Sequence, residues 1–121
     1  MKILLLGKNG QVGWELQRAL APLGDIIALD RHGLNGLSGD MTQPQAIYDT
    51  ILAVQPDVVV NASAYTAVDL AETEQEKADI VNHQTVKAAA EACLTTNALL
   101  VHYSTDYVFE GMGTTAFVET D

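Results

Sequence analysis

The chain has 121 residues, of which 48% are hydrophobic and 18% are charged, a composition typical of one globular domain and not of a disordered segment. Its formal net charge is −10, so its six lysines and arginines cannot neutralise a nucleic-acid backbone or an anionic membrane surface. An anionic small molecule is compatible with this charge, because backbone N–H groups bind phosphate without basic side chains.

The cysteine content and the N-terminal stretch indicate the compartment. Cys93 is the single cysteine and lies in the alanine-rich run KAAAEAC, which predicts a buried thiol and no internal disulfide. The apolar run in MKILLLG is too short for a signal-peptide core or a membrane span. We therefore expect a cytoplasmic protein with no membrane partner and no nucleic-acid partner.

Short apolar runs alternate with helical patterns along the chain. In chain order, the first half predicts a strand at Ile3–Leu6, a helix at Gln11–Leu20, a strand at Ile26–Asp30 and a weaker strand near Leu37–Gly39. The second half predicts a helix that starts with a Thr42–Gln45 capping box, a strand at Val58–Ala62, a long helix from about Glu74 to Thr96 and a strand at Leu99–Ser104.

This order of elements predicts an α/β fold. Strands that alternate with helices form a parallel sheet joined by right-handed crossovers, so we expect a doubly wound, Rossmann-like sheet with strand order 3-2-1-4-5. The sequence shows no repeat and no linker, which favours one domain over residues 1–121. The last stretch, GMGTTAFVETD, has turn and loop character without a terminating helix, so we expect an incomplete domain.

A glycine-rich turn follows the first strand and opens the first helix. Gly7, Gly10 and Gly13 in GKNGQVG have the spacing that allows a tight turn, the approach of a pyrophosphate and close packing of helix on strand. The N-terminus of the helix, at Gln11 and Val12, offers free N–H groups to phosphates. The alternative is a tight turn that binds no ligand, and the acidic end of the second strand argues against it.

Asp30 ends the second predicted strand. Its carboxylate is placed to accept hydrogen bonds from the adenosine ribose, which favours NADH over NADPH. Lys8 and Arg31 lie nearby and could pair with a 2′-phosphate, although Arg31 is equally explained as a solvated surface charge. We therefore predict NADPH or NADH as the cofactor.

Two further stretches are expected at the same edge of the sheet. Asp40 and Met41 follow the weak strand and could meet the adenine, although a simple turn before the helix explains GDMT nearly as well. The segment NASAYT follows the strand at Val58–Ala62, at the topological switch point where a dinucleotide crosses the sheet. Its small residues Ala62, Ser63 and Ala64 allow close approach of the nicotinamide ribose.

Polar residues crowd the end of the last predicted strand, in the stretch HYSTDYVFEG. Together with GKNGQVGWELQRALAPLG and PDVVVNASAYTAVDLAE, this stretch resembles the N-terminal part of the dTDP-4-dehydrorhamnose reductases, a family of extended short-chain dehydrogenases/reductases. The resemblance covers essentially the whole chain, and it implies that residues 1–121 form an incomplete NAD(P)-binding domain without the C-terminal substrate-binding region. It implies a dTDP-sugar substrate and reduction of its 4-keto group to give dTDP-L-rhamnose, a precursor of surface polysaccharide. A homodimer of the full-length protein is compatible with it.

The resemblance also implies residue roles. Thr105 takes the place of the family's catalytic hydroxyl residue, and a hydroxyl at a strand end can donate to a carbonyl oxygen as charge develops on it. Thr105, Asp106 and Tyr107 would bind the sugar, with Tyr103 toward the nicotinamide; the alternative is that these are only polar residues closing a strand. The predicted cofactor contacts are then Gly7, Gly10, Gln11, Val12, Gly13, Asp30, Asp40, Met41, Ala62, Ala64, Tyr65, Thr66 and Tyr103, and no metal site is predicted.

The family's acid–base pair, a tyrosine with a lysine four residues later, is absent from the 121 residues. Thr105 therefore belongs to half of a site, and we expect the chain alone to be inactive. Two rival interpretations keep the fold: a non-catalytic subunit resembling the methionine adenosyltransferase beta subunit, and an epimerase or dehydratase of the extended family. The stretch STDYVF favours the reductase over both.

Overall fold

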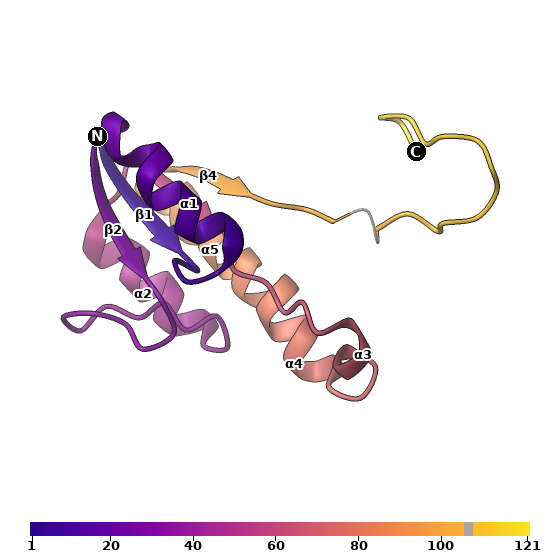
Figure 1. Cartoon of the computed structure of the whole chain (residues 1–121). Coiled ribbons are helices and arrows are strands. Elements are labelled where there is room, and N and C mark those ends of the chain that lie inside the picture. Colours follow the sequence, from indigo (N-terminus) through magenta and orange to yellow (C-terminus); the bar gives the residue numbers. More distant parts are fainter. Residues whose placement is uncertain (106–107) are drawn as a thin grey trace.

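A four-stranded parallel sheet forms the centre of the structure, a computed structural model that describes residues 1–105 and 108–121 (Figure 1). Its strands are β1 (Lys2–Leu6), β2 (Asp25–Leu29), β3 (Val58–Asn61) and β4 (Leu99–His102). The main helices are α1 (Gln11–Leu20), α2 (Pro44–Val54) and α5 (Thr85–Thr96). Shorter helical segments are η1 (Ala21–Leu23), α3 (Val68–Ala71), α4 (Gln75–Asp79) and the π-helical η2 (Ile80–Gln84).

The strands lie in the order β2-β1-β3-β4, and each neighbouring pair is parallel. At the carboxyl edge Leu6 lies opposite both Leu29 and Asn61, and Asn61 lies opposite His102. The doubly wound fold is thus confirmed, and the residues that follow β1, β2 and β3 meet at one edge of the sheet.

The prediction of a weak strand near Leu37–Gly39 is wrong. This was strand 3 of the predicted order 3-2-1-4-5, so the observed sheet has the other four strands in the predicted order. Leu34 and Leu37 form an isolated antiparallel bridge instead, around a turn in which Asn35 and Gly36 have positive φ. Gly39 packs directly against the end of β2, where a side chain would overlap the Asp30 carbonyl oxygen. This stretch covers the end of β2 and does not extend the sheet.

Helices pack on both faces of the sheet, because alternate residues of β1 and β3 point to opposite sides. One face carries the larger core, in which β-strand residues pack against α2 and α5: Leu4, Leu6, Leu29, Val59, Ile47, Ile51, Ala89, Ala92 and Cys93. The other face packs Ile3, Leu5 and Val60 against Leu16 and Leu20 of α1. Cys93 is buried as predicted, and its burial raises the pKa of the thiol.

Two details of the helices differ from the predictions. The Thr42–Gln45 capping box does not form, because α2 begins at Pro44, a residue suited to the first helical position, and the Thr42 hydroxyl donates to Asp40 Oδ1 (2.7 Å). The long helix expected from about Glu74 to Thr96 is a continuous helical run of α4, η2 and α5, with a π-turn in its middle.

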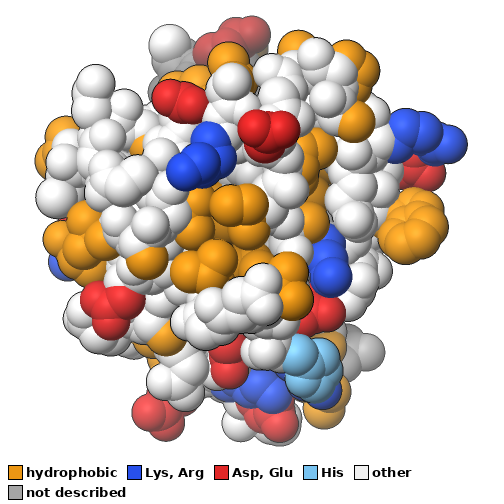
Figure 2. Space-filling model, turned by 90° about the vertical axis from the view of Figure 1, so that its left-hand side faces the viewer, with side chains coloured by type: hydrophobic (Ala, Val, Ile, Leu, Met, Phe, Trp, Pro, Cys, Tyr) orange, Lys and Arg blue, Asp and Glu red, His pale blue; other side chains and the backbone are white. Residues whose placement is uncertain are grey.

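The surface near β4 differs from the surface near β2 and α2. Beyond β4 the chain runs away from the sheet, and its described residues are exposed as far as Asp121 (Figure 1). On the opposite side, where β2 and α2 lie, hydrophobic side chains gather at the centre of the surface with charged ones around them (Figure 2). Among the described residues, the structure has no helix of the length and apolarity needed to span a bilayer.

Candidate functional site

A cleft of about 930 Å³ lies at the carboxyl ends of β1, β2 and β3. All the predicted cofactor contacts line it except Gly13, which is buried behind the turn, and Tyr103, which follows β4. Arg31 and Ser63, which were considered as neighbours of the cofactor, also line the cleft. The remaining lining residues were not predicted: Asn9, His32, Gly39, Thr42 and Val81. Folding therefore brings together the segments that follow β1, β2 and β3, and adds Val81 from η2.

The three glycines of the first turn have different structural roles. Gly7 has φ of +84°, and a Cβ there would lie 2.8 Å from the backbone nitrogen of Ser63. A Cβ at Gly13 would overlap the carbonyl oxygen of Gly7, so this glycine lets α1 pack onto the turn. A Cβ at Gly10 would meet no protein atom closer than 3.7 Å. Gly7 and Gly13 thus serve the fold, whereas the space beside Gly10 is open to the cleft.

The N-terminus of α1 faces this open space. Gly10 is the N-cap residue, no side chain caps the helix, and its first turn carries no acidic residue. The Trp14 N–H donates to the Gly10 carbonyl (2.8 Å), and the preceding residues Gln11 and Val12 line the cleft. The first turn of an α-helix has N–H groups without intrahelical partners and a partial positive charge, so this end suits an anion.

Asp30 is held by two hydrogen bonds at the end of β2. The backbone N–H of His32 donates to Oδ1 and the side-chain amide of Asn9 donates to Oδ2, both at 2.9 Å. The bond from His32, together with that from Asn9 and the charge of Lys8, lowers the pKa of Asp30, so the group is ionised at neutral pH. The sequence analysis did not predict a role for Asn9, although its position inside the glycine turn places it close to the end of β2.

Asp40 and Met41 form the wall beyond β2. Asp40 Oδ1 accepts from both the backbone N–H (2.9 Å) and the hydroxyl of Thr42, which is the bonding expected of a turn before a helix. Met41 is buried beside the cleft, and its carbonyl accepts a hydrogen bond from the Thr85 hydroxyl (2.6 Å). Asp40 therefore stabilises the turn before α2 through Oδ1, as the turn interpretation of GDMT expects. Asp40 and Met41 also border the cleft.

The segment after β3 forms the third wall. Ala62 N–H donates to the Leu6 carbonyl (2.9 Å), and Ser63 N–H donates to Asn61 Oδ1 (3.1 Å). The Tyr65 hydroxyl donates to Glu74 at 2.6 Å, and this bond raises the pKa of Tyr65. Because its proton is held by a carboxylate, Tyr65 is unsuited to the role of a proton donor.

The described residues that follow β4 do not line the cleft. Tyr103 is 49% exposed, Thr105 is exposed, and neither lines the cleft. Asp106 and Tyr107 lie outside the described residues. His102, the last residue of β4, contacts β3, since its Nδ1 lies 3.1 Å from Asn61 Nδ2.

Fold and site together define a class: a Rossmann-like α/β domain with a glycine turn and an acidic residue at the end of the second strand. The family model described as RmlD substrate binding domain matches residues 1–121, and the chain belongs to this family. The curated dTDP-4-dehydrorhamnose reductases of Escherichia coli (strain K12) and Salmonella typhimurium are 52% and 54% identical to it over 121 residues. The resemblance seen in the sequence is thereby confirmed.

Solved structures agree with this assignment. A dTDP-4-dehydrorhamnose reductase from Clostridium acetobutylicum has a TM-score of 0.89 and 36% identity, covering 100% of this chain and 42% of that one. The Bacillus anthracis enzyme in complex with NADP has a TM-score of 0.79 and 33% identity, covering 91% and 38%. A UDP-glucose 4-epimerase from Thermus thermophilus, at 18% identity and a TM-score of 0.68, shares the fold alone. The chain spans about 40% of the length of the curated relatives named above.

Proposed function

We propose that this chain is the dinucleotide-binding part of a dTDP-4-dehydrorhamnose reductase and that it binds NADPH or NADH in the cleft. The observation that carries the proposal is the open space beside Gly10 at the uncapped N-terminus of α1. A pyrophosphate needs both a backbone it can approach and unpaired N–H donors. Family membership supports this function over the epimerase and regulatory-subunit alternatives.

The residues around the cleft fit the successive parts of a dinucleotide. The first turn of α1 would hold the pyrophosphate, Asp30 would accept from the adenosine ribose, and Met41 would cover the adenine. Ala62 and Ala64 leave room for the nicotinamide ribose beside β3. When bound, the cofactor supplies the hydride, and the chain's own residues orient it and exclude water.

The surroundings of Asp30 support use of both cofactors. An ionised Asp30 attracts ribose hydroxyls and repels a 2′-phosphate, which favours NADH. Arg31 lines the same cleft and the charge of Lys8 acts on Asp30, so both cations are placed to offset that repulsion. We propose that NADH and NADPH bind with comparable affinity.

For the parent protein we propose reduction of the 4-keto group of dTDP-4-dehydro-L-rhamnose. Thr105 would donate a hydrogen bond to the carbonyl oxygen as negative charge develops on it, and Asp106 and Tyr107 would bind the sugar. A tyrosine with a lysine four residues later is absent from the sequence. We therefore place the proton donor in the part of the parent that corresponds to the rest of the longer relatives.

The partner and location predictions follow from the same proposal. The dTDP-sugar is the expected partner, and a homodimer of the full-length protein stays a prediction. The single buried cysteine is typical of a reducing compartment, which supports a cytoplasmic location.

The cofactor proposal is tested by calorimetric titration of the chain and of Gly10→Val with NADPH and NADH. The valine side chain would fill the space that the pyrophosphate needs, so we expect binding to the variant to be lost. Because this space holds no protein atoms, thermal unfolding should show that the variant still folds. Equal binding by the two proteins would overturn the proposal.

A further inference from the structure

Two Asn-Gly pairs occur in the chain, Asn9–Gly10 and Asn35–Gly36. In such a pair the backbone nitrogen of the glycine can attack the side-chain carbonyl carbon of the asparagine, because no Cβ shields that nitrogen. Both residues of each pair are exposed, so access to solvent does not distinguish the two pairs. Their hydrogen bonds do.

The Asn35–Gly36 pair occupies the two central positions of a tight turn. Both residues have positive φ, +51° and +80°, as a type I′ turn requires, and Leu34 and Leu37 exchange backbone hydrogen bonds of 3.0 and 2.9 Å around them. Within the part of the chain that the structure describes, neither the Gly36 N–H nor the Asn35 amide has a hydrogen-bond partner. A Cβ at Gly36 would meet no atom within 4 Å. The pair is therefore free to react when this isolated bridge opens locally.

The Asn9–Gly10 pair is held by hydrogen bonds on both reacting groups. The Asn9 amide donates to Asp30 Oδ2 at 2.9 Å, and the Gly10 N–H donates to the Gly7 carbonyl at 3.3 Å. Because the acceptor at Asp30 is a carboxylate, that bond is stronger than one between neutral groups. Both bonds must break before the Gly10 nitrogen can attack Asn9.

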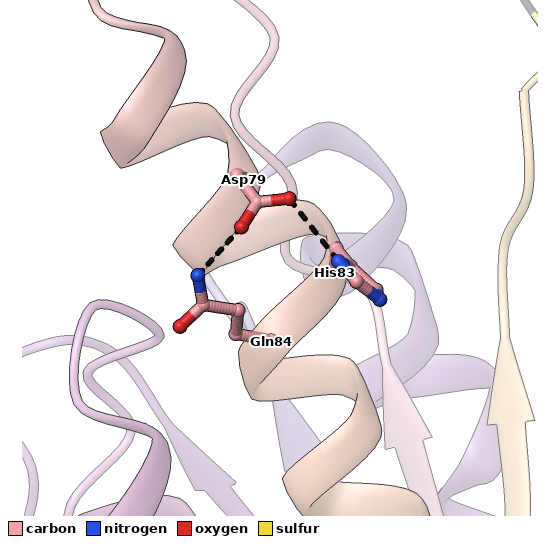
Figure 3. Close-up of polar contacts among 3 residues, drawn as sticks. All are labelled: Asp79, His83 and Gln84. Atoms are coloured by element: carbon pink, nitrogen blue, oxygen red, sulfur yellow. Dashed lines mark hydrogen bonds and ion pairs between the residues drawn. The ribbon is translucent and has the colours of Figure 1, made fainter.

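The other asparagines of the chain precede residues with a Cβ, which shields the backbone nitrogen: Asn61, Asn82 and Asn97. The residue after Asn82 is His83, a bulky side chain whose ring is held 3.1 Å from the Asp79 carboxylate (Figure 3). The N–H of Ala98, which follows Asn97, donates to the Cys93 carbonyl (2.9 Å). Sequence and structure together thus make Asn35 the most reactive asparagine.

We propose that Asn35 is a site of spontaneous deamidation and that Asp30 protects Asn9 from the same reaction. A base in the solvent removes the Gly36 N–H proton, and the nitrogen forms a bond to Asn35 Cγ. The bond from Cγ to Nδ2 breaks, and the amide nitrogen takes up a proton and leaves as ammonia. Water then opens the cyclic imide at either carbonyl and gives aspartate or isoaspartate at position 35. The reaction needs no oxidant, reductant or enzyme.

The modified residue lies on the loop that borders the adenosine end of the cleft. This loop leaves β2 at Asp30 and returns to it, since the Gly33 N–H donates to the Asp30 carbonyl (3.1 Å) and Gly39 packs on the same carbonyl. Arg31 and His32 lie on the loop and line the cleft. Isoaspartate adds a negative charge and one main-chain atom to the loop, so it opposes the charge of Arg31 and disrupts the two-residue turn. We expect weaker binding of the 2′-phosphate of NADPH, an effect that rests on the proposed function.

The experiment follows Asn9 and Asn35 in one sample while the chain is incubated in mildly alkaline buffer. Trypsin cleaves between them, after Arg18 and Arg31, so they fall in different peptides. Mass spectrometry measures the deamidated fraction of each peptide, and methylation by protein isoaspartyl methyltransferase identifies isoaspartate. The variants are Asn35→Gln, whose longer side chain closes the ring less readily, and Asp30→Ala, which removes the acceptor of the Asn9 amide.

In the original chain we expect Asn35 to deamidate at least about tenfold faster than Asn9, because a hydrogen bond to a charged group holds Asn9. Asp30→Ala should bring the rate at Asn9 close to that at Asn35, and thermal unfolding checks that this variant folds. In the incubated original chain the dissociation constant for NADPH should rise roughly two- to fivefold, and that for NADH should rise less. Incubated Asn35→Gln should keep the NADPH affinity that it has when fresh.

The outcomes separate this proposal from the proposed function. A rate at Asn9 equal to or above that at Asn35 in the original chain would overturn the deamidation proposal. An unchanged rate at Asn9 in Asp30→Ala would overturn the protection by Asp30, and equal NADPH affinity of fresh and deamidated chain would overturn the effect on the cofactor. Absence of NADPH binding by the fresh chain would overturn the proposed function but not the deamidation, because both rates are measured without cofactor.

Discussion

The carboxyl ends of β1, β2 and β3 differ from the end of β4 in how the following residues are held. After β1 and β3, backbone N–H groups donate to a neighbouring strand, as Gly7 does to Leu29 and Ala62 does to Leu6. After β2, Asp30 accepts a hydrogen bond from the Asn9 side chain. After β4, an outer strand with β3 as its neighbour, the described residues are exposed. The comparison teaches that a strand end becomes a positioned site when other segments cover it on both sides.

The largest expected effect concerns the reaction. The 121-residue chain should reduce dTDP-4-dehydrorhamnose at least about 10²–10⁴-fold more slowly than the full-length parent, because the chain lacks a positioned proton donor. The measurement is cofactor absorbance at saturating sugar nucleotide for both proteins. Substantial turnover by the purified chain would show that the end of β4 is already a complete site.

The next effect concerns stability, and it compares the two regions directly. Gly13→Ala places a methyl group on the backbone of Gly7, so we expect a loss of about 1–3 kcal/mol in the free energy of unfolding. Met112→Ala, at a 77% exposed position beyond β4, should change it by less than about 0.5 kcal/mol. Urea unfolding of the three proteins measures both values, and similar losses for the two variants would contradict the comparison.

A smaller effect is expected on cofactor choice. Asp30→Ala removes an acceptor for the ribose hydroxyls and also removes repulsion of a 2′-phosphate. The ratio of the dissociation constants should therefore shift toward NADPH. Asn9→Ala, which leaves the carboxylate in place but removes one of its two donors, should shift the ratio less. Identical losses for NADH and NADPH in Asp30→Ala would show that Asp30 does not contact the ribose.

The smallest effect concerns the π-turn. Hydrogen bonds from Gln84 and His83 lower the pKa of Asp79, so the ionised form contributes stability at neutral pH. A carboxyl group whose pKa is lowered by folding loses this contribution as the pH falls through the lowered value. Thermal unfolding should show that the original chain is slightly more stable than Asp79→Asn at pH 6 and that the difference is lost as the pH falls through the lowered pKa of Asp79. A difference that is constant over this range would show that the carboxylate charge has no part in it.

Much of the fold was predictable because its signals are local. The apolar runs of β1 and β3 and the amphipathic pattern of α1 identify their own structure, and the glycine turn between β1 and α1 predicts one wall of the cleft. The bounds of α1, Gln11–Leu20, are those predicted.

The remaining features depend on contacts between distant residues. Leu37–Gly39 has the composition of a strand, but the positive φ at Gly36 turns it back on itself. Beside the π-turn, Thr85 bonds to Met41 and Asn82 bonds to Tyr65, and no periodicity within the helix predicts these bonds.

The π-turn also has a consequence for chain length. An α-helix rotates by about 100° for each residue, so a protein with one residue fewer in Ile80–Gln84 would turn α4 by about this angle relative to α5. Its asparagine would then face away from the segment after β3. A one-residue gap opposite Ile80–Gln84 in an alignment therefore marks relatives in which some other residue must hold that segment.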